Sequence, residues 1–337
     1  MVIKNWIGGK LKNTHDNDYI KKFNPHDGKF LYNIVNSKIN DINDAIDSAH
    51  EAFKIWSDFT PVKRGQILGN IVLGMKSNMK QLSECIATET GKSIKDAHAE
   101  VNAAILQAEF FAGEGMRLYG KSLTSGMRGK YTHSVRQPHG IVGLIVPANT
   151  PIANIAWKTF PALICGNSII LKASEDSPKI ALLFAKITKE AGLPDGIFNV
   201  IQGDGKISGS LLVSCHRISL ISFTGSTSVG KQIAQIAGAR LARVSLELGG
   251  KNPFIVCDDA DIDKTILIAP GTIVMWYNGT LIPDGWTLCD GYQGTPDLRN
   301  RFIKGGNLSN SSNTPKTKDR GGNNKIYLNI NNIPDHL

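Results

Sequence analysis

Cysteine is scarce in this sequence, and its arrangement excludes two kinds of protein. The 337 residues contain five cysteines, which are scattered along the chain and odd in number. A domain held together by disulfides needs a dense, paired set, so we expect this chain to fold in a reducing compartment. No two cysteines have the C-x-x-C spacing of a structural zinc site, and we expect no metal centre.

Long hydrophobic runs are missing too. No uninterrupted apolar stretch approaches the roughly 18 residues that a membrane-spanning helix needs. The first residues, from Met1 to Trp6, do not form the apolar core of a signal peptide. We therefore expect a cytoplasmic protein without membrane insertion.

Blocks of like charge are absent, although the formal net charge is +9 at pH 7. Lysines and arginines are spread along the chain rather than clustered in one basic segment. A spread positive charge can attract nucleotide phosphates or nucleic acid, but an ordinary solvated surface explains it better. We expect no nucleic-acid partner.

The C-terminal part of the chain lacks the best helix formers. The 71 residues of 267–337 contain one Ala and no Glu, but ten Asn and nine Gly. Since Asn and Gly favour turns, short strands and loops are predicted there, with a low-complexity stretch GGNLSNSSNTPKTKDRGGNN. The change in composition divides the chain into a domain of residues 1–266 and a second domain of residues 267–337.

Residues 1–266 alternate helical patterns with short apolar runs. Residues 41–56 carry apolar side chains at helical spacing, and Asp41 suits the start of that helix. From residue 140, the runs GIVGLIVP, NSIILK, IFNVIQG, ISLISFTG and NPFIVC alternate with helical segments. This alternation predicts an α/β fold with a parallel, doubly wound (Rossmann-like) sheet that helices cover on both faces. Ligands of such sheets bind at the carboxyl ends of the strands.

One strand-to-helix turn, in ISFTGSTSVGKQ, carries Gly225 and Gly230. Glycine lets the backbone approach a ligand closely, and the amides at the start of the helix favour a phosphate. The spacing is nearly that of a nucleoside-triphosphate P-loop, but Gln232 stands where that motif needs a hydroxyl for magnesium. A turn with a purely structural role stays open as the alternative.

Four segments, VPANTP, LKASEDSP, FTGSTSVG and LELGGKNP, occur in an order and at a spacing that resemble the aldehyde dehydrogenase superfamily. The resemblance extends from about Trp6 to Ile266. It implies that the chain binds a nicotinamide dinucleotide, NAD or NADP, and belongs to a family that oxidises aldehydes.

The resemblance also implies roles for individual residues. Asn149 would stabilise the oxyanion formed from the aldehyde, Lys172 and Glu175 would bind the adenosine ribose hydroxyls, and Glu247 would activate water as a general base. The turn that would meet the pyrophosphate comprises Gly225, Ser226, Thr227, Ser228, Val229 and Gly230. Each residue has a structural alternative: a surface ion pair, a helix cap, or a carboxylate held by nearby amides.

The nucleophilic cysteine of that family is not found. Relatives carry it well beyond the glutamate, whereas the resemblance stops at Ile266. Cys257 follows Glu247 by only ten residues, in an apolar run typical of a buried structural thiol. Without a nucleophile, the oxyanion donor and the base cannot form the covalent intermediate. The chain is therefore predicted to bind cofactor and to be inactive alone.

Residues 270–306 resemble a different family, the phage tail collar domain. The blocks IPDGWTLCDG and TPDLRNRF carry this resemblance, and NINNIPDH fits the next block. It implies a small β-rich fold, possible self-association of chains through it, and a structural place for Cys289. Three interpretations stay open: a dehydrogenase-family chain, a virion tail-fibre or adhesion protein with a recruited dehydrogenase-like domain, and a fusion of gene fragments.

Overall fold

The structure is a computed structural model and describes residues 1–249. Its centre is a seven-stranded sheet with the strand order β12-β11-β8-β9-β10-β2-β3. The strands are β2 (Asn5–Ile7), β3 (Lys10–Lys12), β8 (Ile141–Ile145), β9 (Ser168–Lys172), β10 (Phe198–Ile201), β11 (Ile218–Gly225) and β12 (Arg243–Leu248).

The sheet is mixed rather than wholly parallel, which corrects the expectation from the sequence. Strands β12, β11, β8, β9 and β10 are mutually parallel, but β2 pairs antiparallel with β10 and β3 antiparallel with β2. Strands β2 and β3 form a hairpin at one edge, and their shortness hid them from the apolar-run pattern. The predicted strand NPFIVC lies outside the described residues.

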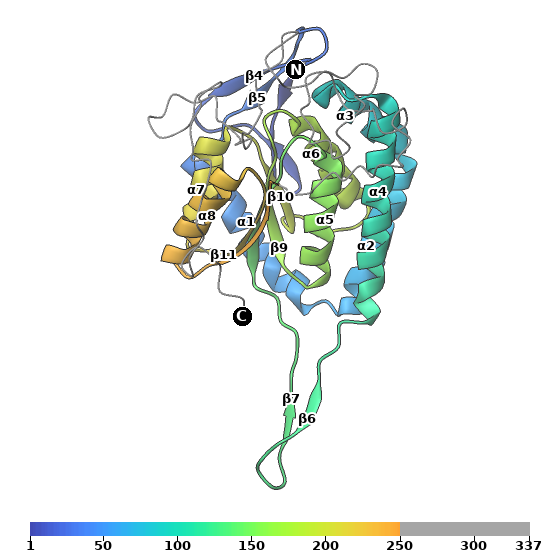
Figure 1. Cartoon of the computed structure of the whole chain (residues 1–337), viewed down its shortest axis with the longest axis vertical. Coiled ribbons are helices and arrows are strands. Elements are labelled where there is room, and N and C mark those ends of the chain that lie inside the picture. Colours follow the sequence, from blue (N-terminus) through green and yellow to red (C-terminus); the bar gives the residue numbers. More distant parts are fainter. Residues whose placement is uncertain (250–337) are drawn as a thin grey trace, which may run out of the picture. The chain divides into compact units, whose positions relative to one another are not determined.

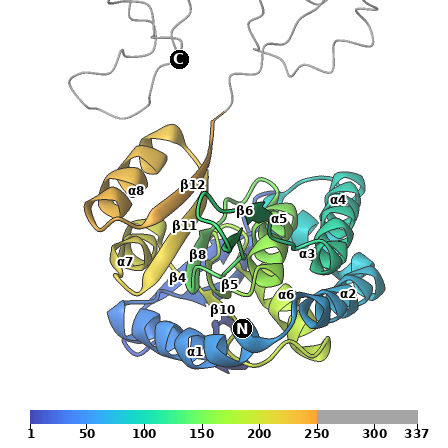
Figure 2. The ribbon, with the colours of Figure 1, turned by 90° about the horizontal axis from the view of Figure 1, so that it is seen from below.

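Helices cover both faces of the sheet, as predicted (Figure 2). On one face lie α5 (Pro151–Ile164) and α6 (Pro178–Glu190); on the other lie α1 (Ile39–Asp58), α7 (Ser210–Ser214) and α8 (Thr227–Ala239). Strand β9 illustrates the division, because Ile169 and Leu171 join the core beneath α5 and α6 whereas Ile170 joins the core beneath α1. All three side chains are fully buried.

A second helical layer packs on α5 and α6. It consists of α2 (Pro61–Ser77), α3 (Met79–Thr90) and α4 (Ile94–Gly113). A smaller sheet with the order β1-β5-β4 joins β1 (Val2–Ile3), β5 (Phe30–Val35) and β4 (Tyr19–Phe23). The strands β6 (Ser122–Thr124) and β7 (Tyr131–His133) form a ribbon that extends away from the other elements (Figure 1).

Helix α1 begins slightly earlier than the sequence indicated. It starts at Ile39, with Lys38 as N-cap, and Asp41 lies at its third position. There the Asp41 carboxylate accepts a hydrogen bond of 2.9 Å from the Lys38 amide, so Asp41 still stabilises the helix start. Among the apolar residues at helical spacing in the predicted helix of residues 41–56, Ile42, Ala45, Ile46 and Ala49 are buried, whereas Phe53 is only half-buried.

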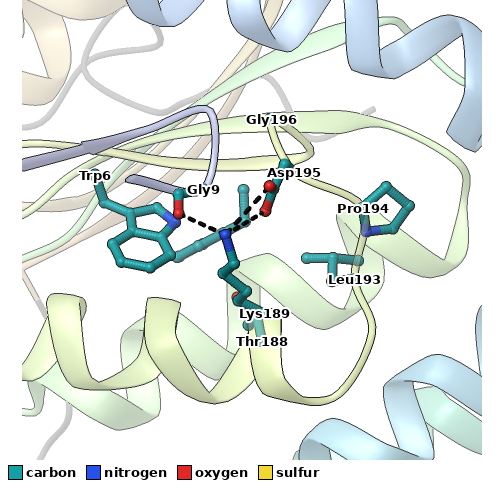
Figure 3. A pocket seen from close by; sticks show the side chains of 9 residues that line it. Trp6, Gly9, Thr188, Lys189, Leu193, Pro194, Asp195 and Gly196 are labelled. Atoms are coloured by element: carbon teal, nitrogen blue, oxygen red, sulfur yellow. Dashed lines mark hydrogen bonds and ion pairs between the residues drawn. The ribbon is translucent and has the colours of Figure 1, made fainter. Parts of the chain in front are cut away.

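The β2–β3 hairpin is fixed to the rest of the domain by Lys189 of α6 (Figure 3). The Lys189 ammonium donates to the Gly9 carbonyl at 2.9 Å and to the Asp195 carboxylate at 3.2 Å, and it lies 6.0 Å from the centre of the Trp6 ring. Gly9 has a φ of +71°, and a Cβ there would lie 1.9 Å from Asp195 Oδ1. Only glycine fits this turn.

Candidate functional site at the carboxyl ends of the parallel strands

The predicted site residues all follow, or end, neighbouring parallel strands. Asn149 lies in the loop after β8, Lys172 ends β9, Gly225 ends β11, and Glu247 is the second-last residue of β12. The register pairs Ile145 with Lys172, and Thr224 with Glu247. These strand ends therefore lie at one level on the same edge of the sheet.

The chain changes direction in the sheet at this point. From β8 it continues through β9 to β10 on one side, and then returns to form β11 on the other side of β8. Two neighbouring connections that leave in opposite directions create a crevice, which is the usual ligand site of open α/β sheets. The β8–α5 loop and the β11–α8 turn border it.

Lys172 and Glu175 form an ion pair at the end of β9. The Lys172 side chain is 2% exposed, and its ammonium lies 2.8 Å from Glu175 Oε2. Burial acts to raise the pKa of the Glu175 carboxyl, but the charge and hydrogen bond of Lys172 outweigh it, so the pKa lies below its ordinary value. The pair presents a fixed donor and an ionised acceptor side by side.

The turn from β11 to α8 exposes the start of a helix. Ser226 is the N-cap, and its hydroxyl accepts a long hydrogen bond, 3.4 Å, from the Val229 amide. Ser226 to Val229 are all exposed, and no described residue accepts a hydrogen bond from the amides of Thr227 and Ser228. Unpaired first-turn amides at the positive end of the helix dipole form a site for an anion.

Gly230 lets α8 pack closely on the end of β12. A Cβ at this position would lie 2.4 Å from one methyl carbon of Leu248, next to Glu247. The glycine predicted to serve the phosphate turn thus also sets the spacing between the helix and the strand that carries the predicted base.

The loop that carries Asn149 is fixed by charged side chains from outside the sheet. The Lys92 ammonium donates to the Asn149 carbonyl and to Glu100 Oε2, both at 2.7 Å. The other carboxylate oxygen of Glu100 accepts from the amides of Ile152 and Ala153, at 2.9 and 3.3 Å. The Asn149 residue itself is exposed, so its side-chain amide is accessible to a ligand.

Lys158 is a site residue that the sequence reasoning missed. It lies on α5, is 9% exposed, and donates to the Ser222 hydroxyl of β11 at 2.8 Å. Burial lowers the pKa of this ammonium to about 8, and the charge of Glu247 acts in the opposite direction. The available signal was a single charge in the otherwise apolar helix IANIAWKTFPALI.

The similarity of this chain to known proteins identifies its family. The model of the aldehyde dehydrogenase family matches residues 12–276. The chain belongs to the aldehyde dehydrogenase family.

Three relatives illustrate the match. The chain is 37% identical to the mitochondrial succinate-semialdehyde dehydrogenase of Arabidopsis thaliana, over 77% of this chain and 49% of that protein. It is 36% identical to the NADP⁺-dependent D-glyceraldehyde dehydrogenase of Picrophilus torridus, over 78% of this chain and 54% of that protein. The crystal structure of PnpE in complex with nicotinamide adenine dinucleotide superposes with a TM-score of 0.75 at 31% sequence identity. The superposition covers 78% of this chain and 54% of that one.

The chain spans about half the length of these aldehyde dehydrogenases. The matched part contains all the predicted site residues, from Asn149 to Glu247. The blocks IPDGWTLCDG and TPDLRNRF, on which the expectation of a second domain rests, lie beyond the end of the family match and outside the described residues.

Of the three described cysteines of this aldehyde dehydrogenase family member, Cys165 and Cys215 lie away from the site, and Cys85 is buried. Cys165 is the C-cap of α5, so the helix, about 20 Å long, separates it from Asn149 at the other end. Cys215 precedes β11, whose length of about 25 Å separates it from Gly225. Cys85 is buried in α3, where burial raises the pKa of its thiol.

Neither a membrane span nor a metal cluster is found among residues 1–249. No helix in this range is long and apolar enough to cross a membrane. The same residues contain no group of three or more histidine, cysteine, aspartate or glutamate side chains arranged to hold a metal ion.

Proposed function

We propose that this chain binds a nicotinamide dinucleotide, NAD or NADP, at the carboxyl ends of β8, β9 and β11. The observation that carries the proposal is the exposed start of α8. Its first-turn amides, at Thr227 and Ser228, have no described acceptor, and the turn lies beside the crevice where the sheet changes direction. A pyrophosphate would fit there, because the amides donate and the helix dipole favours negative charge.

The Lys172–Glu175 pair suits the adenosine ribose. Two neighbouring hydroxyls can donate to the carboxylate of Glu175 and accept from the ammonium of Lys172, which are 2.8 Å apart. Because the pKa of Glu175 is lowered, its carboxylate stays ionised and would repel a 2′-phosphate. We therefore expect NAD to bind more tightly than NADP.

Asn149 and Glu247 suit the reacting end. The side-chain amide of Asn149 would donate to the oxygen of an aldehyde as negative charge develops on it, and Glu247 would accept a proton from water. The dinucleotide, when bound, would supply the hydride acceptor for aldehyde oxidation. Aldehydes are the proposed substrate class, in keeping with the semialdehyde and glyceraldehyde dehydrogenases among the relatives.

We further propose that the chain does not oxidise aldehydes by itself. The family reaction needs a thiolate next to the oxyanion donor, and a displacement of even about 1 Å can cost on the order of a hundredfold in rate. Cys165 lies at the far end of α5 from Asn149, Cys215 precedes β11, and Cys85 is buried in α3, where burial raises the pKa of its thiol. Cys257 and Cys289 lie outside the described residues, and their sequence contexts are a strand-like run and a collar-like motif.

Calorimetric titration with NAD and with NADP tests the binding proposal. We expect saturable binding of both, with NAD the tighter, and Glu175→Gln should narrow the difference because it removes the repelling charge. Glu51→Gln on the exposed face of α1 is the matched control and should change neither affinity. No heat of binding at millimolar cofactor would exclude the proposed function.

The activity proposal has its own assay. We expect no NADH from aldehydes with the unaltered chain, and no change after Cys257→Ser or Cys289→Ser. NADH formation that Cys289→Ser abolishes and Cys257→Ser preserves would show that the thiol of Cys289 reaches the site, contrary to the proposal.

A structural role in a phage tail is the second candidate. It rests on the collar-like motifs of residues 270–306 in the sequence. Self-association through residues 267–337 is the expectation specific to this candidate. Sedimentation of the full chain and of a chain ending at residue 266 tests this candidate function. If the collar-like segment associates, only the full chain should form oligomers.

A further inference from the structure

Glu89, in the last turn of α3, is a buried carboxylate surrounded by donors. The residue is 1% exposed. Its Oε1 accepts hydrogen bonds from the Tyr32 hydroxyl and from the Lys179 amide, the latter at 2.9 Å. Its Oε2 accepts from the Ile180 amide at 3.1 Å and from the Cys85 thiol at 3.5 Å. Both oxygens are thus bound to the start of α6.

Helix α6 has no cap of its own. Its N-cap residue, Ser177, makes no side-chain capping bond, and its hydroxyl has no partner among the described residues. Pro178 at the first position has no amide hydrogen. The next two amides, those of Lys179 and Ile180, donate hydrogen bonds to the Glu89 carboxylate. A carboxylate from a distant helix therefore takes the place of the N-cap.

The cofactor loop lies between β9 and this helix start. Only residues 173–177 separate Lys172, which is fixed by burial at the end of β9, from Pro178 at the start of α6. Glu175 is in the middle of this loop. Gln202 adds a hydrogen bond of 3.0 Å to the Pro178 carbonyl. With so few residues between two fixed ends, the position of α6 determines where Glu175 lies relative to Lys172.

We propose that Glu89 is a positioning residue for the dinucleotide site. It holds the start of α6 and thereby keeps the Glu175 carboxylate beside Lys172, in the geometry that two ribose hydroxyls require. This role rests on the proposed function. Glu89 touches no ligand, so its loss acts by lowering the fraction of molecules whose loop is competent to bind, and the apparent affinity falls by that fraction.

The chain offers a matched control in Glu100. Glu100 accepts from the Ile152 and Ala153 amides of α5, which also begins with a proline, Pro151, and whose N-cap makes no side-chain bond. Glu89→Gln and Glu100→Gln therefore remove the same kind of carboxylate from equivalent helix starts. Only Glu89 lies next to the Lys172–Glu175 loop.

The test measures binding of ADP-ribose, which contains the adenosine ribose and the pyrophosphate but no nicotinamide. We expect Glu89→Gln to weaken ADP-ribose binding about tenfold, as when about a tenth of the molecules remain competent. Glu100→Gln should change it less than about twofold, although both variants lower the melting temperature. Equal weakening in both variants would mean a general loss of structure and would overturn the proposal.

Two further variants test the route through Glu175. Because Glu89 acts through that side chain, the effects of Glu89→Gln and Glu175→Gln on ADP-ribose affinity should not add. Additive effects would contradict the proposal. If Glu89→Gln fails to fold, Tyr32→Phe is the alternative, because it removes one donor from the Glu89 carboxylate. We expect Tyr32→Phe to lower the ADP-ribose affinity about threefold. The same substitution should have no effect in a chain that already carries Glu175→Gln.

The outcomes also separate this role from the proposed function. An unaltered chain that binds no ADP-ribose would exclude both. An unaltered chain that binds, with variants at Glu89 and Tyr32 that bind equally well, would overturn the positioning role alone.

Discussion

Three helices follow neighbouring parallel strands in this domain, and their first turns differ. Helices α5 and α6 begin with Pro151 and Pro178, and their next amides donate to the buried carboxylates of Glu100 and Glu89. Helix α8 has only the hydroxyl of Ser226, at 3.4 Å, and an exposed first turn. The same strand–helix unit thus occurs with and without a carboxylate at its positive end.

This difference indicates where an anion can bind. A carboxylate already at a helix start satisfies the amides and repels a second negative charge. A pyrophosphate is therefore disfavoured at α5 and α6 and favoured at α8. Glu89 of α3 and Glu100 of α4 reach the helix starts but not the crevice: Glu89 supports the Lys172–Glu175 loop, and Glu100 supports the Asn149 loop at the proposed reacting end.

The largest expected effect comes from removing a carboxylate from one of the occupied helix starts. Glu100→Gln leaves Lys92 without its ionic partner and the Ile152 and Ala153 amides without a charged acceptor. We expect the free energy of unfolding to fall by about 3 kcal/mol, because two buried amides and the partly exposed Lys92 ammonium lose a charged acceptor. Urea denaturation measures it.

The control for this loss is Glu51→Gln, which breaks an exposed ion pair with Lys54. It should have no measurable effect, since water and salt screen such a pair. If Glu100→Gln also left the free energy of unfolding unchanged, the carboxylates would not stabilise the helix starts. The difference between α8 and the other two helices would then not affect stability.

A smaller effect concerns Lys158, a buried charge with only a hydroxyl partner. At pH 7 both the folded and the unfolded chain hold its proton, so the cost of burying the charge is fully present. Because the folded pKa is lowered from 10.5 to about 8, the unfolded chain binds more protons between these values, and stability rises with pH in that window.

Lys158→Met should remove this cost. We expect the variant to be more stable than the unaltered chain at pH 7 by about 2 kcal/mol, which is roughly 3 for the charge less about 1 for the unpaired Ser222 hydroxyl. The advantage should shrink as pH rises from 8 to 10.5. Urea denaturation across this range measures it, and a variant less stable at pH 7 would contradict the prediction.

The smallest expected effect comes from placing a carboxylate at the start of α8, where the unaltered chain has none. Val229 is 42% exposed at the third position of the helix, so Val229→Glu would create a capping box with Ser226 and place a carboxylate at the helix start, as in α5 and α6. We expect NAD affinity to fall at least about tenfold, or about 1.4 kcal/mol, with stability unchanged or slightly raised. Calorimetry and thermal denaturation measure the two quantities.

Val229→Gln is the matched control, because it offers a similar side chain without the charge. It should retain most of the affinity. Equal binding by Val229→Glu and the unaltered chain would mean that the pyrophosphate does not lie at α8.

Much of this arrangement was predictable from the sequence. Apolar runs and helical spacing predicted the parallel strands β8 to β11, the helices on both faces, and the edge where Asn149 and Lys172 lie, but not β12, which carries Glu247. Periodicity reports which side chains face a core, but it does not report strand order, such as the return of the chain from β10 to the other side of β8. The edge hairpin, with strands of three residues, was too short for that signal.

The side chains that support the site could not be predicted in this way. Glu89 and Lys179 are ninety residues apart, and Lys92 and Asn149 are 57 residues apart in the chain. Nothing in the local pattern distinguishes Glu89 or Glu100 from an exposed helical glutamate. Their roles follow from packing between α3, α4 and the helices after β8 and β9, which depends on the whole fold.

The hairpin that Lys189 fixes also covers an edge of the central sheet. Strand β2 uses the hydrogen-bonding edge of β10, which would otherwise accept a strand from another molecule. The new edge, β3, is exposed and carries Lys10 and Lys12, whose charges oppose strand addition. We therefore expect an alteration in residues 1–12 that uncovers β10 to promote aggregation.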